Sequence, residues 1–275
     1  MGKFDNIVIA SDMDGTFLGK NCELVCENIE KIKYFNQNGG KFTIITGRNY
    51  TTVFDPYPEL ADIVSAPVGL HNGACIYDIK NGSVVDDTPI DTELVIEMFR
   101  YLREFYPKVS TSLRCLTRFY FMPPDHASEW YKPFEYSIFD FSDCEEIRKL
   151  SVQKINFKCD ETAYLSEVRS SIEKKYGDKI DCTTAEPTIV EIMPKGISKA
   201  IVIPRLRSLC KLENAKFFAI GDYENDLAML RSADYAACPD NALETVKDIC
   251  AIHVCHHFNG AIANLIDIIE EQYLG

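Results

Sequence analysis

Two aspartates, Asp12 and Asp14, stand one residue apart directly after the apolar stretch 7–10 of the sequence. That stretch predicts a buried strand, and two carboxylates at the end of such a strand repel each other and resist removal from water. A positive charge placed beside them would compensate both costs. The pair therefore predicts a binding site at this strand end rather than a feature of the hydrophobic core.

Polar segments follow three further predicted strands in the same way. They are residues 46–48 (Thr-Gly-Arg), 195–199 (Lys-Gly-Ile-Ser-Lys) and 221–226 (Gly-Asp-Tyr-Glu-Asn-Asp). Functional groups of open parallel sheets gather at the carboxyl ends of the strands. We therefore expect all four segments to converge at one edge of a sheet.

These residue types match the requirements of phosphoryl transfer. A carboxylate such as Asp12 can serve as the nucleophile, and Asp14 can serve as acid and base. Asp222 can complete an oxygen-ligand set for Mg²⁺, a hard cation that offsets the repulsion between carboxylates and an incoming phosphate. Lys199 adds a positive charge, and the hydroxyl of Thr46 adds a hydrogen-bond donor to phosphoryl oxygens.

Strand and helix patterns alternate in the two terminal parts of the chain. Apolar and β-branched stretches predict strands at 7–10, 41–46, 63–68, 74–77, 190–193, 217–220 and 235–238. Helical spacing of apolar residues predicts helices at 23–38, 198–210, 224–232, 242–250 and 260–271, with a kink or break at Pro204. Such alternation indicates a parallel sheet with right-handed crossovers.

The middle of the chain has a different pattern, with helices predicted at 91–106 and 161–176 and β-rich pieces at 113–121, 152–158 and 180–184. We therefore predict an α/β fold in which an α+β insert, residues 84–191, interrupts a doubly wound, Rossmann-like core, residues 1–83 and 192–275. The aromatic stretch 119–141 contains Trp130, and we expect it to form the core of the insert rather than to stack on a sugar or base.

The bulk composition restricts the class of partner. The 275-residue chain has a formal net charge of -13, which argues against nucleic acid, since binding the phosphate backbone needs a basic face. No apolar stretch approaches the roughly 20 residues of a membrane span, and no targeting segment is visible. The 11 cysteines, an odd number without a secretory signal, favour reduced thiols in a cytoplasmic protein. The oligomeric state cannot be inferred.

At this point the chain resembles a known group of enzymes. The order Asp-x-Asp-Gly-Thr, Thr-Gly-Arg, Ser-Lys and Gly-Asp-x-x-Asn-Asp is similar to that of the haloacid dehalogenase superfamily of phosphatases. The large insert after the second motif resembles that of the Cof-like sugar-phosphate phosphatases, as do residues 71–74 (His-Asn-Gly-Ala) and 259–261 (Asn-Gly-Ala). The resemblance implies a phosphatase that hydrolyses small phosphorylated metabolites, foremost sugar phosphates, beneath a mobile cap.

The resemblance also implies roles for individual residues. Asp12 would form an aspartyl-phosphate, and Asp14 would protonate the leaving alcohol and then activate water. Mg²⁺ would be held by the side chains of Asp12 and Asp222 and by the main-chain carbonyl of Asp14, with Asp226 supporting it from behind. Thr46 and Lys199 would bind the phosphoryl oxygens. The remaining residues expected to bind phosphate or substrate are Gly15, Gly47, Arg48, Asn72 and Asn225.

Two other functions compete with this interpretation. A phosphotransferase or phosphomutase of similar fold would pass the phosphoryl group to a sugar hydroxyl instead of water. A binding or regulatory protein would keep the fold on an inactive core, but the intact set of Asp12, Asp14, Lys199 and Asp222 weighs against it. A calcium loop starting at Asp12 is disfavoured because Phe17 occupies the sixth position, where glycine is required.

Some polar residues have no assigned role. Arg48 can reach a phosphate or form a structural ion pair, and Lys195 is expected to be a solvated charge or an outer phosphate neighbour. Candidate substrate contacts in the insert are Arg114, Arg118, His126 and Lys154. The spacing of Cys250, His253, Cys255, His256 and His257 does not match a zinc pattern, and we expect a strand and loop there.

Overall fold

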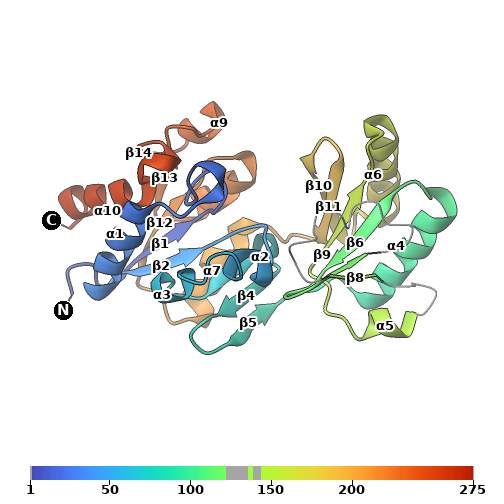
Figure 1. Cartoon of the computed structure of the whole chain (residues 1–275), viewed down its shortest axis with the longest axis horizontal. Coiled ribbons are helices and arrows are strands. Elements are labelled where there is room, and N and C mark those ends of the chain that lie inside the picture. The colour runs from blue at the N-terminus through green and yellow to red at the C-terminus, as the bar shows by residue number, and fades with distance from the viewer. Residues whose placement is uncertain (1, 122–135, 139–143, 275) are drawn as a thin grey trace. The chain divides into compact units, whose positions relative to one another are not determined.

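The computed structural model describes residues 2–121, 136–138 and 144–274 of the chain (Figure 1). Its internal contacts divide the chain into two compact units. The core unit comprises Met1–Gly47, Tyr57–Asp86 and Ser198–Gly275, and the cap unit comprises Arg48–Pro56 and Asp87–Ile197. The domain boundaries expected from the sequence, after residues 83 and 191, stay a prediction.

A five-stranded parallel sheet, in the order β14-β13-β12-β1-β2, forms the centre of the core unit. Its strands are β1 (Ile7–Ser11), β2 (Lys41–Ile44), β12 (Lys216–Ile220), β13 (Tyr235–Pro239) and β14 (Ile252–Val254). The chain adds β2 on one side of β1 and later adds β12 on the other side. Ligands of open α/β sheets bind at such a reversal of strand order. The predicted doubly wound, Rossmann-like core is confirmed.

Helices cover both faces of this sheet, because its central strands are apolar on both sides (Figure 1). Val8 and Ala10 of β1 pack in one cluster with side chains of α7 (Val202–Leu209) and α8 (Leu227–Ser232). On the opposite face, α1 (Cys26–Gln37) packs against α10 (Ala261–Gln272), and Tyr273 at the end of α10 contacts Phe218. The short helices α3 (Leu60–Ile63) and α9 (Glu244–Lys247) complete the unit.

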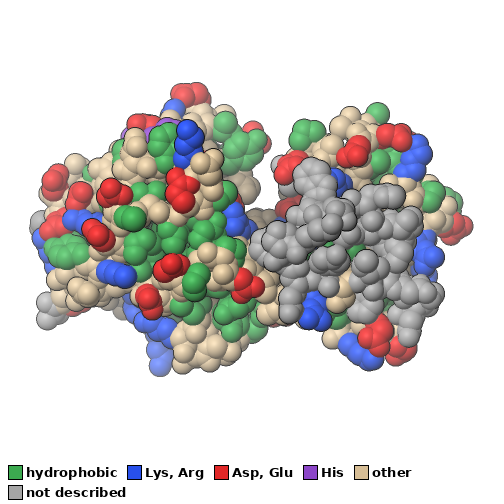
Figure 2. Space-filling model, viewed as in Figure 1, with side chains coloured by type: hydrophobic (Ala, Val, Ile, Leu, Met, Phe, Trp, Pro, Cys, Tyr) green, Lys and Arg blue, Asp and Glu red, His purple; other side chains and the backbone are tan. Residues whose placement is uncertain are grey.

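The surface of the core unit carries charges of both signs. On the face visible in Figure 2, acidic and basic side chains are interspersed among apolar ones rather than gathered by sign. Among the residues that the structure describes, no helix combines the length and the apolar character that a membrane crossing requires.

A second, three-stranded sheet of the core unit differs from the prediction. Its strands are β3 (Val68–Leu70), β4 (Cys75–Asp78) and β5 (Ser83–Asp87), and β3 pairs with β4 in antiparallel fashion. The strand expected at 63–68 begins only at Val68, after α3, and Gly69 of β3 forms a parallel bridge with Ile45 next to β2, as a parallel sheet predicts. The strand expected at 74–77 pairs antiparallel with β3, so its assignment to the parallel sheet is wrong. Only three residues, His71–Gly73, separate β3 from β4, and a parallel connection needs a crossover of a dozen residues or more.

The helix expected at 198–210 is not broken at Pro204, since α7 continues through that residue. A 3₁₀ turn, Lys199–Ile201, comes first, and α7 starts at Val202. Pro204 is therefore the third residue of the α-helix, where its missing N–H breaks no intrahelical hydrogen bond. The 3₁₀ turn carries Lys199, whose side chain is buried.

The cap unit contains a six-stranded sheet in the order β10-β11-β9-β6-β7-β8. Its strands are β6 (Ser110–Arg114), β7 (Phe119–Phe121), β8 (Tyr136–Ile138), β9 (Lys154–Lys158), β10 (Ile180–Glu186) and β11 (Ile189–Pro194). The strand expected before Lys195 was predicted to belong to the core, which is wrong, because β11 pairs antiparallel with β9 and β10. The α/β alternation of the core therefore returns only at Ser198.

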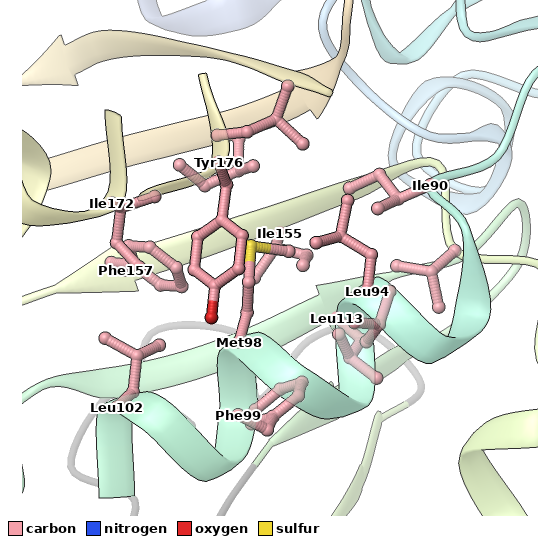
Figure 3. Packing of buried hydrophobic residues seen from close by; sticks show 14 of the residues in the cluster. Ile90, Leu94, Met98, Phe99, Leu102, Leu113, Ile155, Phe157, Ile172 and Tyr176 are labelled. Carbon is pink, nitrogen blue, oxygen red and sulfur yellow. The ribbon is translucent and has the colours of Figure 1, made fainter. Parts of the chain in front are cut away.

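The hydrophobic core of the cap unit lies between its sheet and its helices (Figure 3). Leu94, Met98 and Leu102 of α4 (Thr92–Phe105) pack toward Ile155 and Phe157 of β9 (Figure 3). The other helices are α2 (Tyr50–Phe54), α5 (Cys144–Arg148) and α6 (Thr162–Tyr176). Of the aromatic stretch, Phe119 and Phe121 are buried, whereas Trp130 and His126 lie outside the described residues.

Candidate active site

Three carboxylates meet at the carboxyl ends of β1 and β12, where the strand order reverses. Asp12 follows β1, and its N–H donates to the carbonyl of Ile220 at 2.9 Å. Asp222 and Asp226 follow β12. One ligand oxygen from each of Asp12, Asp222 and Asp226 lies within 4.8 Å of the other two. The structure thus brings together the first and the last of the four polar segments.

Lys199 lies between two of these carboxylates. Its Nζ is 2.5 Å from Oδ1 of Asp12 and 2.7 Å from Oδ1 of Asp226. The lysine side chain is only 2% exposed. Lys195, the other lysine of this segment, pairs with Asp181 of the cap unit at 2.7 Å. The geometry therefore places Lys199, and not Lys195, in the acidic cluster.

The charges of the cluster are unbalanced, with three carboxylates to one lysine. Burial, reinforced by the charge of Asp226, raises the pKa of Asp12 well above its usual range, although Lys199 opposes the shift. Burial also raises the pKa of Asp222 to about 6, against the hydrogen bond from Thr16. Burial alone would lower the pKa of Lys199, but the charges of Asp12 and Asp226 outweigh it and raise that pKa.

This donor set fits a hard divalent cation. Mg²⁺ prefers oxygen ligands and is typically held by one or two carboxylates with several waters. The cluster offers carboxylate oxygens from Asp12, Asp222 and Asp226, and their negative charge exceeds that of the one lysine. A cation at this position would offset the like-charge repulsion that, after burial, raises the pKa of Asp12.

Asp226 also holds the loop after β12. It is fully buried, and its Oδ2 accepts hydrogen bonds from the N–H groups of Asp222 and Tyr223, both at 3.1 Å. Its other oxygen receives the bond from Lys199. A Cβ at Gly221 would lie 2.5 Å from the Cβ of Asp226, so only glycine fits there. Asn225, in the same loop, is exposed.

The turn after Asp12 packs closely against Asp222. Gly15 has a φ of +77°, and a Cβ on it would lie 2.4 Å from Oδ2 of Asp222. The Thr16 hydroxyl donates to Oδ1 of Asp222 at 2.7 Å. The Asp14 side chain is exposed. The Asp-x-Asp-Gly-Thr motif therefore shapes a tight turn whose backbone touches the acidic cluster.

The second polar segment lies against a strained turn. The N–H of Asn72 donates to the carbonyl of Thr46 at 2.9 Å, and a Cβ on Gly47 would lie 3.0 Å from Oδ1 of Asn72. His71, Asn72 and Gly73 have φ values of 50°, 55° and 95°. A Cβ on Gly73 would lie 2.9 Å from the carbonyl oxygen of Ser198. The turn thus connects the Thr46 segment with the one that carries Lys199.

Other predicted residues are not part of this cluster. Arg48 belongs to the cap unit, where it donates to the carbonyl of Thr52 at 3.1 Å. In the cap sheet, Lys154 lies 2.6 Å from Glu191, and the guanidinium of Arg114 stacks over the Phe119 ring. The roles of Arg48, Arg114 and Lys154 in substrate binding stay predictions from the sequence.

The histidines and cysteines near residue 255 do not assemble a metal site in the described part of the chain, where the aspartate cluster is the one group of suitable geometry. Instead, His257 forms hydrogen bonds close to the active-site loops. Its Nδ1 lies 2.6 Å from the carbonyl of Leu18, and its N–H donates to Oδ1 of Asn241 at 3.1 Å. No role was predicted for Asn241, although it lies two residues after strand β13 at the same sheet edge.

Comparisons with known proteins agree with this geometry. A family model described as haloacid dehalogenase-like hydrolase matches residues 9–266. The chain is 27% identical to the 5-amino-6-(5-phospho-D-ribitylamino)uracil phosphatase YwtE of Bacillus subtilis (strain 168), over 96% of this chain and 99% of that protein.

Solved structures show the same fold. The crystal structure of TM0651 from Thermotoga maritima matches with a TM-score of 0.84 at 21% identity, over 95% of this chain and 96% of that one. A haloacid dehalogenase-like hydrolase from Bacteroides thetaiotaomicron matches with a TM-score of 0.83 at 22% identity, over 96% of this chain and 99% of that one. These likenesses support a Rossmann-like core with an additional cap domain.

Proposed function

Because the chain belongs to the haloacid dehalogenase-like hydrolase family, as its motifs predict, we propose that it is a Mg²⁺-dependent phosphatase of small phosphorylated metabolites. The family and its relatives named as phosphatases support hydrolysis of phosphate monoesters. The observation that carries the proposal is the buried contact between Asp12 and Lys199 beside two further carboxylates. It supplies a nucleophile, a phosphate-binding cation and ligands for a metal in one place.

The reaction proceeds in two steps at Asp12. Its carboxylate oxygen attacks phosphorus, the bond to the ester oxygen breaks, and Asp14 donates its proton to the leaving alcohol. Asp14 then takes a proton from water, whose oxygen attacks the aspartyl-phosphate and releases inorganic phosphate with the free carboxylate. Lys199 and the Thr46 hydroxyl stabilise the negative charge on the phosphoryl oxygens. Asn225, Asn72 and Gly47 border the phosphate.

Mg²⁺ would be held by the carboxylates of Asp12 and Asp222 and by the carbonyl of Asp14, with Asp226 behind them. When bound, it supplies positive charge that offsets the repulsion between the carboxylates and the phosphate dianion. The exposure of Asp14 leaves its carboxyl group accessible to the leaving group and to water. Because the chain has a net charge of -13, attraction of an anionic substrate depends on this local positive charge.

A phosphorylated sugar or sugar derivative is the substrate class that the relatives favour. The name of the Bacillus relative states a substrate with a phosphate on a ribitylamino group. At 27% identity that name supports the chemical class and not the individual compound.

A screen with purified protein tests the proposal. Release of inorganic phosphate from a panel of sugar phosphates, nucleotides and other phosphorylated metabolites is measured with Mg²⁺ and with excess chelator. We expect Mg²⁺-dependent release from one or more sugar phosphates. Full activity in the chelator would contradict the assigned metal site. Transfer to a second sugar that requires a sugar bisphosphate activator, without phosphate release, would instead indicate a phosphomutase.

A further inference from the structure

Asn241 connects three loops at the carboxyl edge of the core sheet. Its Nδ2 donates to the carbonyl of Gly15 at 2.8 Å, and its Oδ1 accepts from the N–H of His257 at 3.1 Å. Gly15 follows β1, Asn241 follows β13 and His257 follows β14. A carbonyl on one side and an N–H on the other leave the amide one orientation that satisfies both.

The same short segment also holds the loop after β12. The N–H of Leu243 donates to the carbonyl of Asp222 at 3.0 Å. Residues 241–243 therefore contact both chain segments that bring carboxylates into the acidic cluster. Neither contact involves a carboxylate directly, so this segment acts on the backbone that carries them.

The position of Gly15 matters because its backbone lies against the Asp222 carboxylate. A Cβ on Gly15 would lie 2.4 Å from Oδ2 of Asp222, and the next residue, Thr16, donates to Oδ1. A displacement of the Gly15 peptide would therefore change the surroundings of both carboxylate oxygens. It would also turn the adjoining peptide of Asp14, whose carbonyl is an expected metal ligand.

We propose that Asn241 is a positioning residue for the cation site, which it controls by fixing the Gly15 carbonyl. The inference rests on the proposed function, since it assumes that the turn after Asp12 helps to hold Mg²⁺. Groups that do not bind the metal but hold its ligands in place by hydrogen bonds typically contribute about 10- to 100-fold to metal affinity. For one bond to a backbone carbonyl we expect the lower end of that range.

Asn28 provides a matched control. It is fully buried, and it too bridges a carbonyl of the turn after β1 and a backbone N–H from the C-terminal part of the chain. Its Nδ2 donates to Phe17 at 3.3 Å, and its Oδ1 accepts from Ala263 at 3.0 Å. Substitution of Asn28 removes the same kinds of hydrogen bond without releasing the Gly15 carbonyl.

The test is Mg²⁺ binding by isothermal titration calorimetry, together with the thermal midpoint of each metal-free protein. We expect Asn241→Ala to weaken Mg²⁺ binding about tenfold. Asn28→Ala should bind Mg²⁺ within about twofold of wild type while losing as much thermal stability or more. Equal Mg²⁺ affinity of Asn241→Ala and wild type, or equal weakening in both variants, would overturn the proposal.

Asn241→Asp is a second variant for the same measurement, and it replaces the alanine variant if that protein does not fold. It keeps the acceptor for His257 but loses the donor to Gly15, and it adds a negative charge that by itself would attract Mg²⁺. We expect weaker Mg²⁺ binding despite that charge, whereas stronger binding would overturn the proposal. Failure of the proposed function would look different: the wild-type protein itself would bind no Mg²⁺ and release no phosphate, and the inference would fall with it.

Discussion

Two aspartate–lysine pairs of similar length lie in the two units of the molecule. In the core unit, Lys199 is 2.5 Å from Asp12, and in the cap unit, Lys195 is 2.7 Å from Asp181. The pKa of the two aspartates nevertheless moves in opposite directions. Burial raises the pKa of Asp12. For Asp181, burial is the largest single effect and also acts to raise the pKa, but the hydrogen bonds from Lys195 and the Gly196 N–H and the charge of Lys195 together outweigh it and lower the pKa.

The difference shows that distance alone does not identify a reactive pair. Asp181 and Lys195 have side chains that are 38% and 53% exposed, so water solvates both charges. Asp12 and Lys199 are buried and share their surroundings with Asp222 and Asp226. An excess of buried carboxylates is costly for folding, and a divalent cation at the site would offset that cost.

The largest contrast is expected from removal of the carboxylate in each pair. Asp12→Asn should lower kcat by on the order of 10⁴-fold or more, since an amide of nearly the same shape is a poor nucleophile. Asp181→Asn should leave phosphate release unchanged. The measurement is steady-state phosphate release, with circular dichroism to verify the fold. Undiminished hydrolysis by Asp12→Asn would remove that residue from its role.

Removal of the lysine from each pair should change the free energy of unfolding by different amounts. Lys199→Met leaves buried carboxylates without their cation and should cost about 3–5 kcal/mol in the free energy of unfolding. Lys195→Met breaks an exposed pair and should cost less than about 1 kcal/mol. Urea denaturation of the metal-free proteins measures both values. Similar losses of unfolding free energy in the two variants would mean that the Lys199 pair contributes no more to stability than the exposed Lys195 pair.

Most of the core site was predictable because its residues follow strands that are apolar without interruption. Residues 7–10 read as a fully buried parallel strand, and Asp12 follows it as expected. Asp222 and Asp226 follow β12 in the same way. Such strands place their carboxyl ends together regardless of the distance between them in the sequence. Lys199 was identified by the resemblance to the family, since two lysines compete in its segment.

The errors arose where the local pattern does not determine the partner of a strand. β11 alternates, with Val190 and Ile192 facing the cap core and Glu191 paired with Lys154, as in an antiparallel strand with one buried face. The predicted assignment of β11 to the parallel core was therefore wrong. Asn241 was missed because its function depends on hydrogen bonds to Gly15 and His257, which no spacing in the sequence reveals.

One glycine with a left-handed backbone lies near each aspartate–lysine pair, so the core and cap sites can also be compared through these glycines. Gly15 has a φ of +77° and Gly196 a φ of +75°, but only Gly15 is crowded, since nothing lies within 4 Å of a Cβ at Gly196. Alanine should cost each site about 1–2 kcal/mol of stability because of the positive φ. Only Gly15→Ala should also displace the Asp222 carboxylate and lower kcat/KM, by about 10- to 100-fold. Equal activity of both variants would contradict the role of the turn.

The smallest effect expected is a pH dependence of stability in the metal-free protein. Because the pKa of Asp222 is raised from 3.8 to about 6, the folded state binds its proton more tightly than the unfolded state. This contribution to stability is present at low pH and is lost as pH rises through about 6. The stability that comes from the lowered pKa of Asp181 is fully present above its ordinary value of 3.8, so this contribution does not change between pH 5 and pH 7.

The thermal midpoint without metal should therefore fall by a few degrees, roughly 2–4 °C, between pH 5 and pH 7. Asp222→Asn should reduce this fall, and Asp181→Asn should leave it unchanged. Mg²⁺ should raise the midpoint more at pH 7 than at pH 5, because a metal ligand must be deprotonated. Scanning calorimetry with and without Mg²⁺ measures all three effects. Because the pKa of Asp12 is raised as well, part of the fall should persist in Asp222→Asn. A fall of unchanged size in that variant would remove Asp222 from the titration and leave the two pairs distinguished by their burial alone.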